Sequence, residues 1–122
     1  MKQLDLNVRQ RLNVTALLGQ QKGNIAQIRL ACRIIDKVEL TPAEREAVDC
    51  QADGATIRWS PAKEVSVPAR RIELEDQEAR YLESVLNGWP GFAPSDIQWL
   101  EPLLAALGPE LTRVNQAGPG RQ

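Results

Sequence analysis

The sequence contains no histidine, only two cysteines and only five aromatic side chains among its 122 residues. Without an imidazole, the chain lacks the general base of serine and cysteine hydrolases and the commonest metal-binding side chain. Cys32 and Cys50 are too few for a structural zinc site, which needs four ligands. We expect both to be buried thiols, with a disulfide or a reactive thiol as the alternatives.

Other motifs that carry chemistry are missing as well. The sequence has no Walker-type phosphate loop, no glycine-rich dinucleotide motif and no G-x-S-x-G. Acidic residues cluster over 73–83, but a helix is expected to begin in this segment, and the dipole of a helix start attracts carboxylates. We therefore predict that the protein is not an enzyme and that it holds no cofactor and no metal.

Long hydrophobic runs are also missing. No segment approaches the ~20 apolar residues that a membrane-spanning helix needs, and the first residues lack the apolar core of a secretory signal. We expect a cytoplasmic protein with no membrane partner.

The charges are unevenly distributed along the chain. Residues 1–40 carry seven Lys and Arg against three Asp and Glu, a balance of +4, whereas residues 41–122 carry eight against thirteen, a balance of −5. The net charge of −1 gives no support to duplex binding as the main activity, because phosphate affinity needs a concentrated basic surface.

The patterns that are present predict a mixed fold. We expect a single compact α+β domain over residues 1–108 and a flexible tail over 109–122. Apolar residues recur at helical spacing over 7–18 and, most regularly, over 25–38, with a glycine-bounded turn between the two segments. This arrangement predicts an N-terminal helical hairpin.

A short helical turn and a β-hairpin are expected next. Thr41 is placed as an N-cap, Pro42 as the first helical residue and Glu44 as the partner in a capping box. Residues 48–59 predict a hairpin that turns at Asp53-Gly54. The turn implies an apolar face and a polar face, which pair Val48 with Trp59, Cys50 with Ile57, Ala52 with Ala55, Asp49 with Arg58 and Gln51 with Thr56.

The second half of the chain predicts one strand and two helices. After an extended connector over 60–69, residues 70–75 alternate as a strand, which completes a small antiparallel sheet of two to three strands. Two C-terminal helices follow, one over 77–87 with Asp76 as its cap. The other starts at Ser95 and ends before Gly108-Pro109, with a kink or restart at Pro102.

Two groups of residues are candidates for binding. Arg29, Arg33 and Lys37 share one helical stripe because they are four residues apart, and the stripe is either a solvated face or a docking strip for an acidic protein or a nucleic-acid backbone. Trp89 and Phe92 lie in the Pro- and Gly-rich loop between the last two helices. They either pack between these helices or stand out as anchors for a partner.

The order of motifs resembles that of small uncharacterised proteins encoded by tailed bacteriophages. The resemblance covers residues 4–107 and rests on LNVRQRL near the start, LTPAERE, DGATIRWSPAKE and a final helix at SDIQWLEPLL. The WPGF loop and the final GPGRQ depart from that pattern. The resemblance implies a phage product that acts in the cytoplasm of a bacterial host or is part of the virion, but it implies no role for any single residue.

We therefore predict a small non-enzymatic protein that binds a host or phage protein through the stripe, the loop or both. One alternative is a virion or assembly component that self-associates, with the strand edge at 70–75 as a possible contact. The other alternative is a nucleic-acid-associated regulator that uses the basic N-terminal third.

Overall fold

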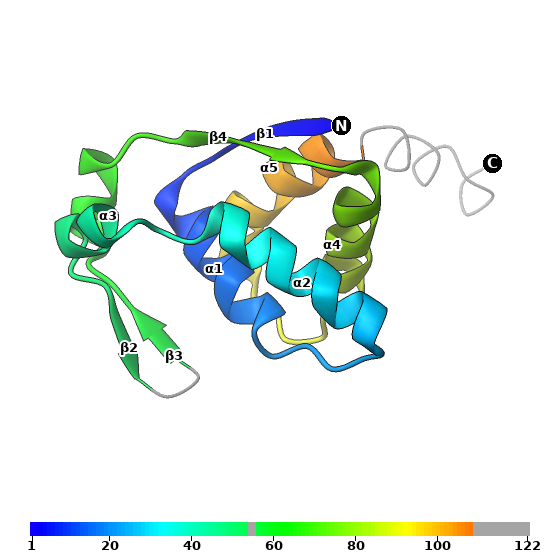
Figure 1. Ribbon diagram of the computed structural model, residues 1–122. Coiled ribbons are helices and arrows are strands. Elements are labelled where there is room, and N and C mark those ends of the chain that lie inside the picture. Colours follow the sequence, from blue (N-terminus) through cyan, green and yellow to red (C-terminus); the bar gives the residue numbers. More distant parts are fainter. Residues whose placement is uncertain (54–55, 109–122) are drawn as a thin grey trace.

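A computed structural model describes residues 1–53 and 56–108 and confirms the α+β fold (Figure 1). The predicted tail over 109–122 lies outside the described residues. The elements, with η for a 3-10 helix, are β1 (Lys2–Leu6), α1 (Val8–Leu18), α2 (Ile25–Val38), α3 (Pro42–Ala47), β2 (Gln51–Asp53), β3 (Thr56–Arg58), η1 (Pro61–Ser66), β4 (Arg70–Leu74), α4 (Asp76–Gly88), η2 (Pro94–Asp96) and α5 (Ile97–Leu107).

The N-terminal helical hairpin and the short helix α3 form as predicted. Each of these three helices begins with a capping box, in which two residues satisfy backbone N–H groups of the first turn; the pairs are Asn7 with Gln10, Asn24 with Gln27 and Thr41 with Glu44. The box also explains Gln27, a polar residue on the apolar side of α2. Its side chain accepts from the Asn24 N–H at 3.1 Å, so it serves the helix start.

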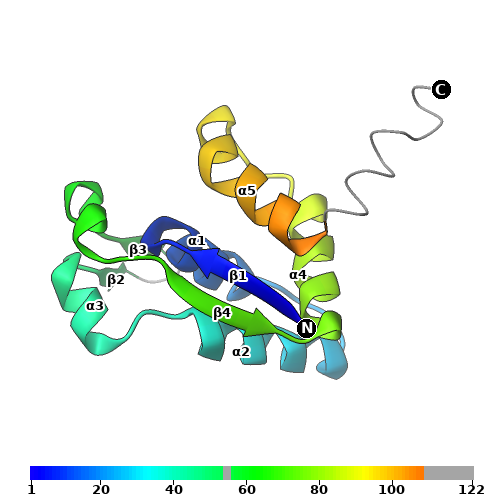
Figure 2. The same ribbon diagram turned by 90° about the horizontal axis from the view of Figure 1, so that it is seen from above.

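The main sheet joins the N-terminal segment to a strand from the middle of the chain, and this pairing was not predicted. β1 pairs antiparallel with β4, with Leu4 opposite Ile72. The predicted strand over 70–75 is therefore present, but its partner is the N-terminal segment, and the hairpin forms a separate two-stranded sheet. In the view from above, the two strands lie across α1 and α2, with α4 and α5 alongside (Figure 2).

The hairpin forms with a register two residues away from the predicted one. Gln51 lies opposite Arg58, where the turn at Asp53-Gly54 had placed Asp49. The difference arises at the turn, because Asp53 was expected within it but is the last residue of β2 and pairs with Thr56. Asp49, with a φ of 53°, lies in a left-handed conformation between α3 and the start of β2 at Gln51. Because a register shift of two residues does not turn a strand over, Ile57 still packs against buried apolar residues, as the predicted apolar face required. Gly54 and Ala55 lie outside the described residues.

Several local predictions in the second half were wrong. The connector over 60–69 is not extended but contains η1, which starts at Pro61, whose ring sets the φ that a helix start requires. The N-cap of α4 is Glu75 rather than Asp76. α5 is preceded by η2, so Ser95 is not its cap, and α5 continues through Pro102 without a restart.

The cysteines also differ from the prediction. Cys32 is exposed on α2 and Cys50 is half-buried, and both thiols are free within the described residues.

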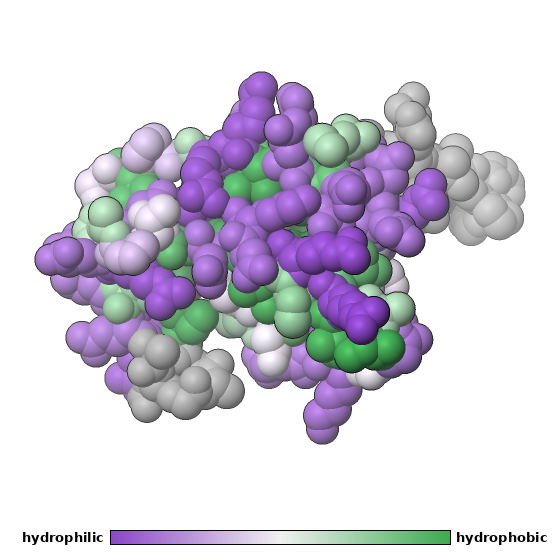
Figure 3. Space-filling model, in the orientation of Figure 1, coloured by the Kyte–Doolittle hydropathy of each residue, from purple (hydrophilic) through white to green (hydrophobic). Residues whose placement is uncertain are grey.

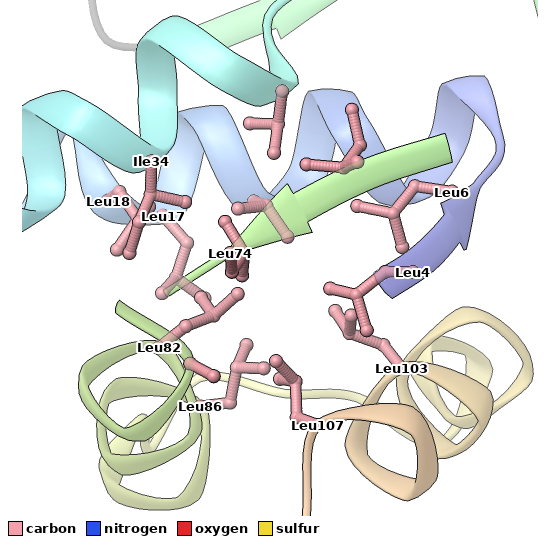
Figure 4. Close-up of a cluster of buried hydrophobic side chains, with 14 of the residues drawn as sticks. Leu4, Leu6, Leu17, Leu18, Ile34, Leu74, Leu82, Leu86, Leu103 and Leu107 are labelled. Atoms are coloured by element: carbon pink, nitrogen blue, oxygen red, sulfur yellow. The ribbon is translucent and has the colours of Figure 1, made fainter. Parts of the chain in front are cut away.

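Most buried side chains form one cluster beneath the main sheet. Residues from β1, β4 and the four long helices meet there, among them Leu4, Leu6, Leu17, Leu18, Ile34, Leu74, Leu82, Leu86, Leu103 and Leu107 (Figure 4). A second, smaller cluster comprises Val8, Leu12, Leu40, Val48 and Val67, with Cys50, Ile57 and Trp59 packed against it.

A buried arginine lies beside the second cluster and ties α1 to α3. The Arg11 side chain is 0 % exposed, and it donates to both carboxylate oxygens of Glu44 at 2.8 Å. It also donates to the carbonyls of Val38, the last residue of α2, and Glu39, its C-cap, at 2.9 and 3.0 Å. All three guanidinium nitrogens of Arg11 thus donate hydrogen bonds, as a buried charge requires.

The Arg11–Glu44 pair makes the protein sensitive to acid. Hydrogen bonds from Arg11 lower the pKa of Glu44 from 4.5 to about 2, although burial opposes this shift. A lowered carboxyl pKa contributes stability above the unfolded value and loses it as the pH falls through the folded one. We expect the free energy of unfolding to fall between about pH 5 and pH 2, and to fall less steeply in Glu44→Gln. Urea unfolding at stepped pH measures this; equal pH slopes for the two proteins would contradict it.

Candidate functional site

The predicted stripe on α2 is only partly available to a partner. Hydrophilic side chains cover most of the face that α2 crosses (Figure 3). Lys37, however, donates to Glu78 on α4 at 2.6 Å, and Arg33 lies 3.8 Å from the Glu75 carboxylate. Arg29 is exposed and makes no ion pair with any described residue. The stripe therefore supplies one unpaired cation rather than three.

Lys37 neutralises a buried carboxylate. The Glu78 side chain is 1 % exposed, and besides Lys37 it accepts from the Glu75 N–H at 2.8 Å. Burial disfavours the charged form of Glu78, but the hydrogen bonds from Lys37 and the Glu75 N–H, together with the charges of Lys37 and Arg33, outweigh it and hold the pKa of Glu78 below its usual value. Within the described part of the chain, Glu78 Oε2 has no hydrogen-bond partner. Lys37 is thus the main compensation for a buried charge and is not free to bind elsewhere.

Two more cations of the basic N-terminal third also face carboxylates. Arg9 pairs with Glu64 at 3.3 Å, and Arg11 is buried against Glu44. Four of the seven Lys and Arg in residues 1–40 therefore face carboxylates of the described chain. This reduces the positive charge that a nucleic-acid backbone would meet.

Trp89 and Phe92 are half-buried against the main cluster. Phe92 meets the buried Trp99 edge to face, with ring centroids 5.9 Å apart. Asp96 fixes the loop, because it accepts from the Trp99 indole at 3.0 Å and from the Ala93 N–H at 2.7 Å. Both side chains therefore pack against the main cluster while remaining partly exposed, and a role as anchors for a partner stays a prediction.

Two hollows flank Trp89 at the end of the molecule opposite the main sheet. One, of about 240 Å³, lies between the α1–α2 turn and α4 and is lined by Lys22, Gln27, Tyr81 and Trp89, among others. The other, of about 180 Å³, lies beside α1 and is lined on its far side by Phe92 and Trp99. Figure 1 shows the α1–α2 turn and the α4–α5 loop side by side at the lower edge. We call this surface, formed by Lys22, Tyr81, Trp89 and Phe92, the aromatic end.

The aromatic end is positive on the side of the α1–α2 turn, whereas Asp96 lines the hollow beside Phe92. Residues 6–35, which form α1, the α1–α2 turn and most of α2, contain no Asp or Glu. Lys22 lines a hollow and has no ion pair among the described residues, and the N-terminus of α2, with its positive dipole, follows directly. Burial raises the pKa of Tyr81 further above neutral, and its hydroxyl is a hydrogen-bond donor at neutral pH.

Sequence reasoning found Trp89 and Phe92 but missed Arg11 and Tyr81. A signal for Arg11 was present, because it lies three residues after Val8 and directly before Leu12, on the apolar side of α1. Tyr81 precedes the apolar residue Leu82 and has no periodic signal of its own. Tyr81 lines a hollow together with residues of the α1–α2 turn, and the two segments become neighbours only in the folded chain.

Comparison with protein-family models, curated proteins and solved structures gives no match to this chain. The resemblance to phage proteins therefore stays a prediction.

No helix among the described residues has the length and apolar character needed to cross a membrane. The same part of the chain contains no group of three or more His, Cys, Asp or Glu side chains placed to hold a metal ion.

Proposed function

We propose that the protein acts by binding another protein through the aromatic end, without catalysing a reaction. The observation that carries this proposal is Trp89, a half-buried indole with a hollow on each side. Tryptophan is strongly enriched among binding hot spots, the interface positions at which truncation to alanine weakens binding most. It offers a large contact area at little cost in conformational entropy.

The shape and charge of the aromatic end define the partner's chemistry. Apolar side chains of the partner fill the two hollows beside Trp89, and an acidic side chain of the partner lies toward Lys22. The loop is held in place by Asp96, so little ordering is required when a partner binds. On the resemblance described above, we further propose that this partner is a host or phage protein.

Removing the indole is expected to weaken partner binding at least about 30-fold, the equivalent of about 2 kcal/mol at a hot spot. The measurement compares capture of partners by the wild type and by Trp89→Ala. Lys22→Glu provides a second variant whose exposed position leaves the fold intact, and it is expected to weaken binding by reversing the local charge.

Val65→Ala is the matched control. Val65 is 91 % exposed on η1, away from the aromatic end, so its loss leaves capture unchanged. Melting temperatures show which variants remain folded. Undiminished capture by both folded variants, Trp89→Ala and Lys22→Glu, would contradict the proposal.

A further inference from the structure

A third and larger hollow, of about 420 Å³, lies where the start of α4 meets the end of α5 and the first residues of β1. It shares no lining residue with the hollows of the aromatic end. Ala79, Leu107 and Gly108 supply its apolar wall, and the rest of the lining is charged. Any function of this hollow is therefore independent of the proposed partner binding.

Glu83 provides the buried charge of this hollow. The residue is 9 % exposed, and it has no hydrogen bond or ion pair with the described residues. Its carboxylate lies against the backbone of Gly108: a Cβ added to that glycine would fall 1.9 Å from Glu83 Oε2. Gly108 caps the C-terminus of α5, where the helix dipole is negative. Two negative poles therefore lie side by side at this end of the hollow, and none of the described residues pairs with the carboxylate, so a cationic group that enters meets a favourable field.

The exposed side of the same hollow carries the opposite charge. Lys2 is half-buried and Arg80 is exposed, and neither forms an ion pair within the described part of the chain. Asp76, the remaining charged residue of the lining, is already 3.1 Å from the amino group of Met1. The hollow is therefore negative at its buried end and positive at its exposed end.

We propose that this hollow binds a small zwitterion that carries both an ammonium and a carboxylate group, the chemistry of a free amino acid. The ammonium group donates to Glu83 and lies near the last carbonyls of α5. The carboxylate group lies toward Arg80 and Lys2. The apolar wall formed by Ala79 and Leu107 contacts the carbon chain between the two groups.

The test uses a series of zwitterions whose charges are increasingly far apart: glycine, β-alanine, 4-aminobutyrate and 6-aminohexanoate. Each is titrated into the full chain at constant ionic strength while backbone amide resonances are followed by NMR. At least one member is expected to produce saturable shifts at Ala79 and Gly108. Ethylammonium and acetate, which carry one charge each, are expected to bind at least tenfold more weakly than that member.

Two variants assign the binding to this hollow. Glu83→Gln is expected to weaken binding at least tenfold, whereas Glu101→Gln, the same change at an exposed position of α5, leaves it unchanged. Arg80→Gln is expected to weaken the zwitterion but not ethylammonium. The proposal is wrong if no member of the series saturates, if ethylammonium binds equally well, or if folded Glu83→Gln binds like the wild type.

Discussion

Replacing Glu44 with glutamine is expected to lower the free energy of unfolding by about 3–5 kcal/mol, the usual cost of removing one partner from a buried ion pair. The reason is Arg11, whose side chain is fully buried and would keep its charge without a counter-ion. For a domain of this size, that loss corresponds to a fall in melting temperature of about 10–20 °C. Thermal and urea unfolding both measure it.

Two further variants separate the buried pair from a general effect of charge. Glu46→Gln removes an exposed carboxylate from the same helix, and it is expected to change stability by no more than about 0.5 kcal/mol. Arg11→Met combined with Glu44→Gln removes the uncompensated charge and is expected to recover part of the loss. A Glu44→Gln protein as stable as the Glu46→Gln control would contradict this role of Arg11.

Replacing Lys37 with methionine is expected to cost about 3 kcal/mol of stability, although the substitution keeps most of the aliphatic stem. Glu78 would remain buried with one oxygen unpartnered and the other without its cation. The same substitution at Arg29, which is exposed and unpaired among the described residues, is expected to change stability by no more than about 0.5 kcal/mol.

This comparison tests whether Lys37 stabilises the fold while Arg29, on the same stripe of α2, does not. Equal stability of Lys37→Met and Arg29→Met, measured by urea unfolding at neutral pH, would show that Lys37 is not needed to neutralise Glu78. Partner capture by folded Lys37→Met is expected to match the wild type, because Lys37 lies outside the aromatic end.

The helices of the first half were predictable because their signals are local. Capping boxes and apolar periodicity over 7–18 and 25–38 depend only on neighbours along the chain, and both helices formed as expected. The alternation at 70–75 also predicted a strand correctly, but alternation does not say which segment pairs with it.

The pairing of β1 with β4 depends on contacts between residues about 70 positions apart. β1 is only five residues long, and its Leu4 and Leu6 give too short an alternation to stand out beside the helix that follows. The predicted register of the hairpin was wrong for a different reason. It was derived from a turn at Asp53-Gly54, whereas Asp53 is itself paired with Thr56.

The candidate surfaces were also predictable only in their local features. Sequence spacing placed Arg29, Arg33 and Lys37 correctly on one stripe of α2. It gave no information about the carboxylates at the start of α4 that pair with Arg33 and Lys37. The aromatic loop was visible in the sequence, whereas the hollows beside Trp89 arise from the α1–α2 turn that the fold brings next to it.

The most direct test of partner binding is site-specific photo-crosslinking in the cells that produce the protein. A photoreactive amino acid replaces Lys22 in one variant and Val65 in another, so that both probes are exposed but only the first lies at the aromatic end. We expect a discrete cross-linked protein from position 22, lost when Trp89→Ala is added, and none from position 65. Equal products from both positions, or a product from position 22 that persists in folded Trp89→Ala, would contradict binding through the aromatic end.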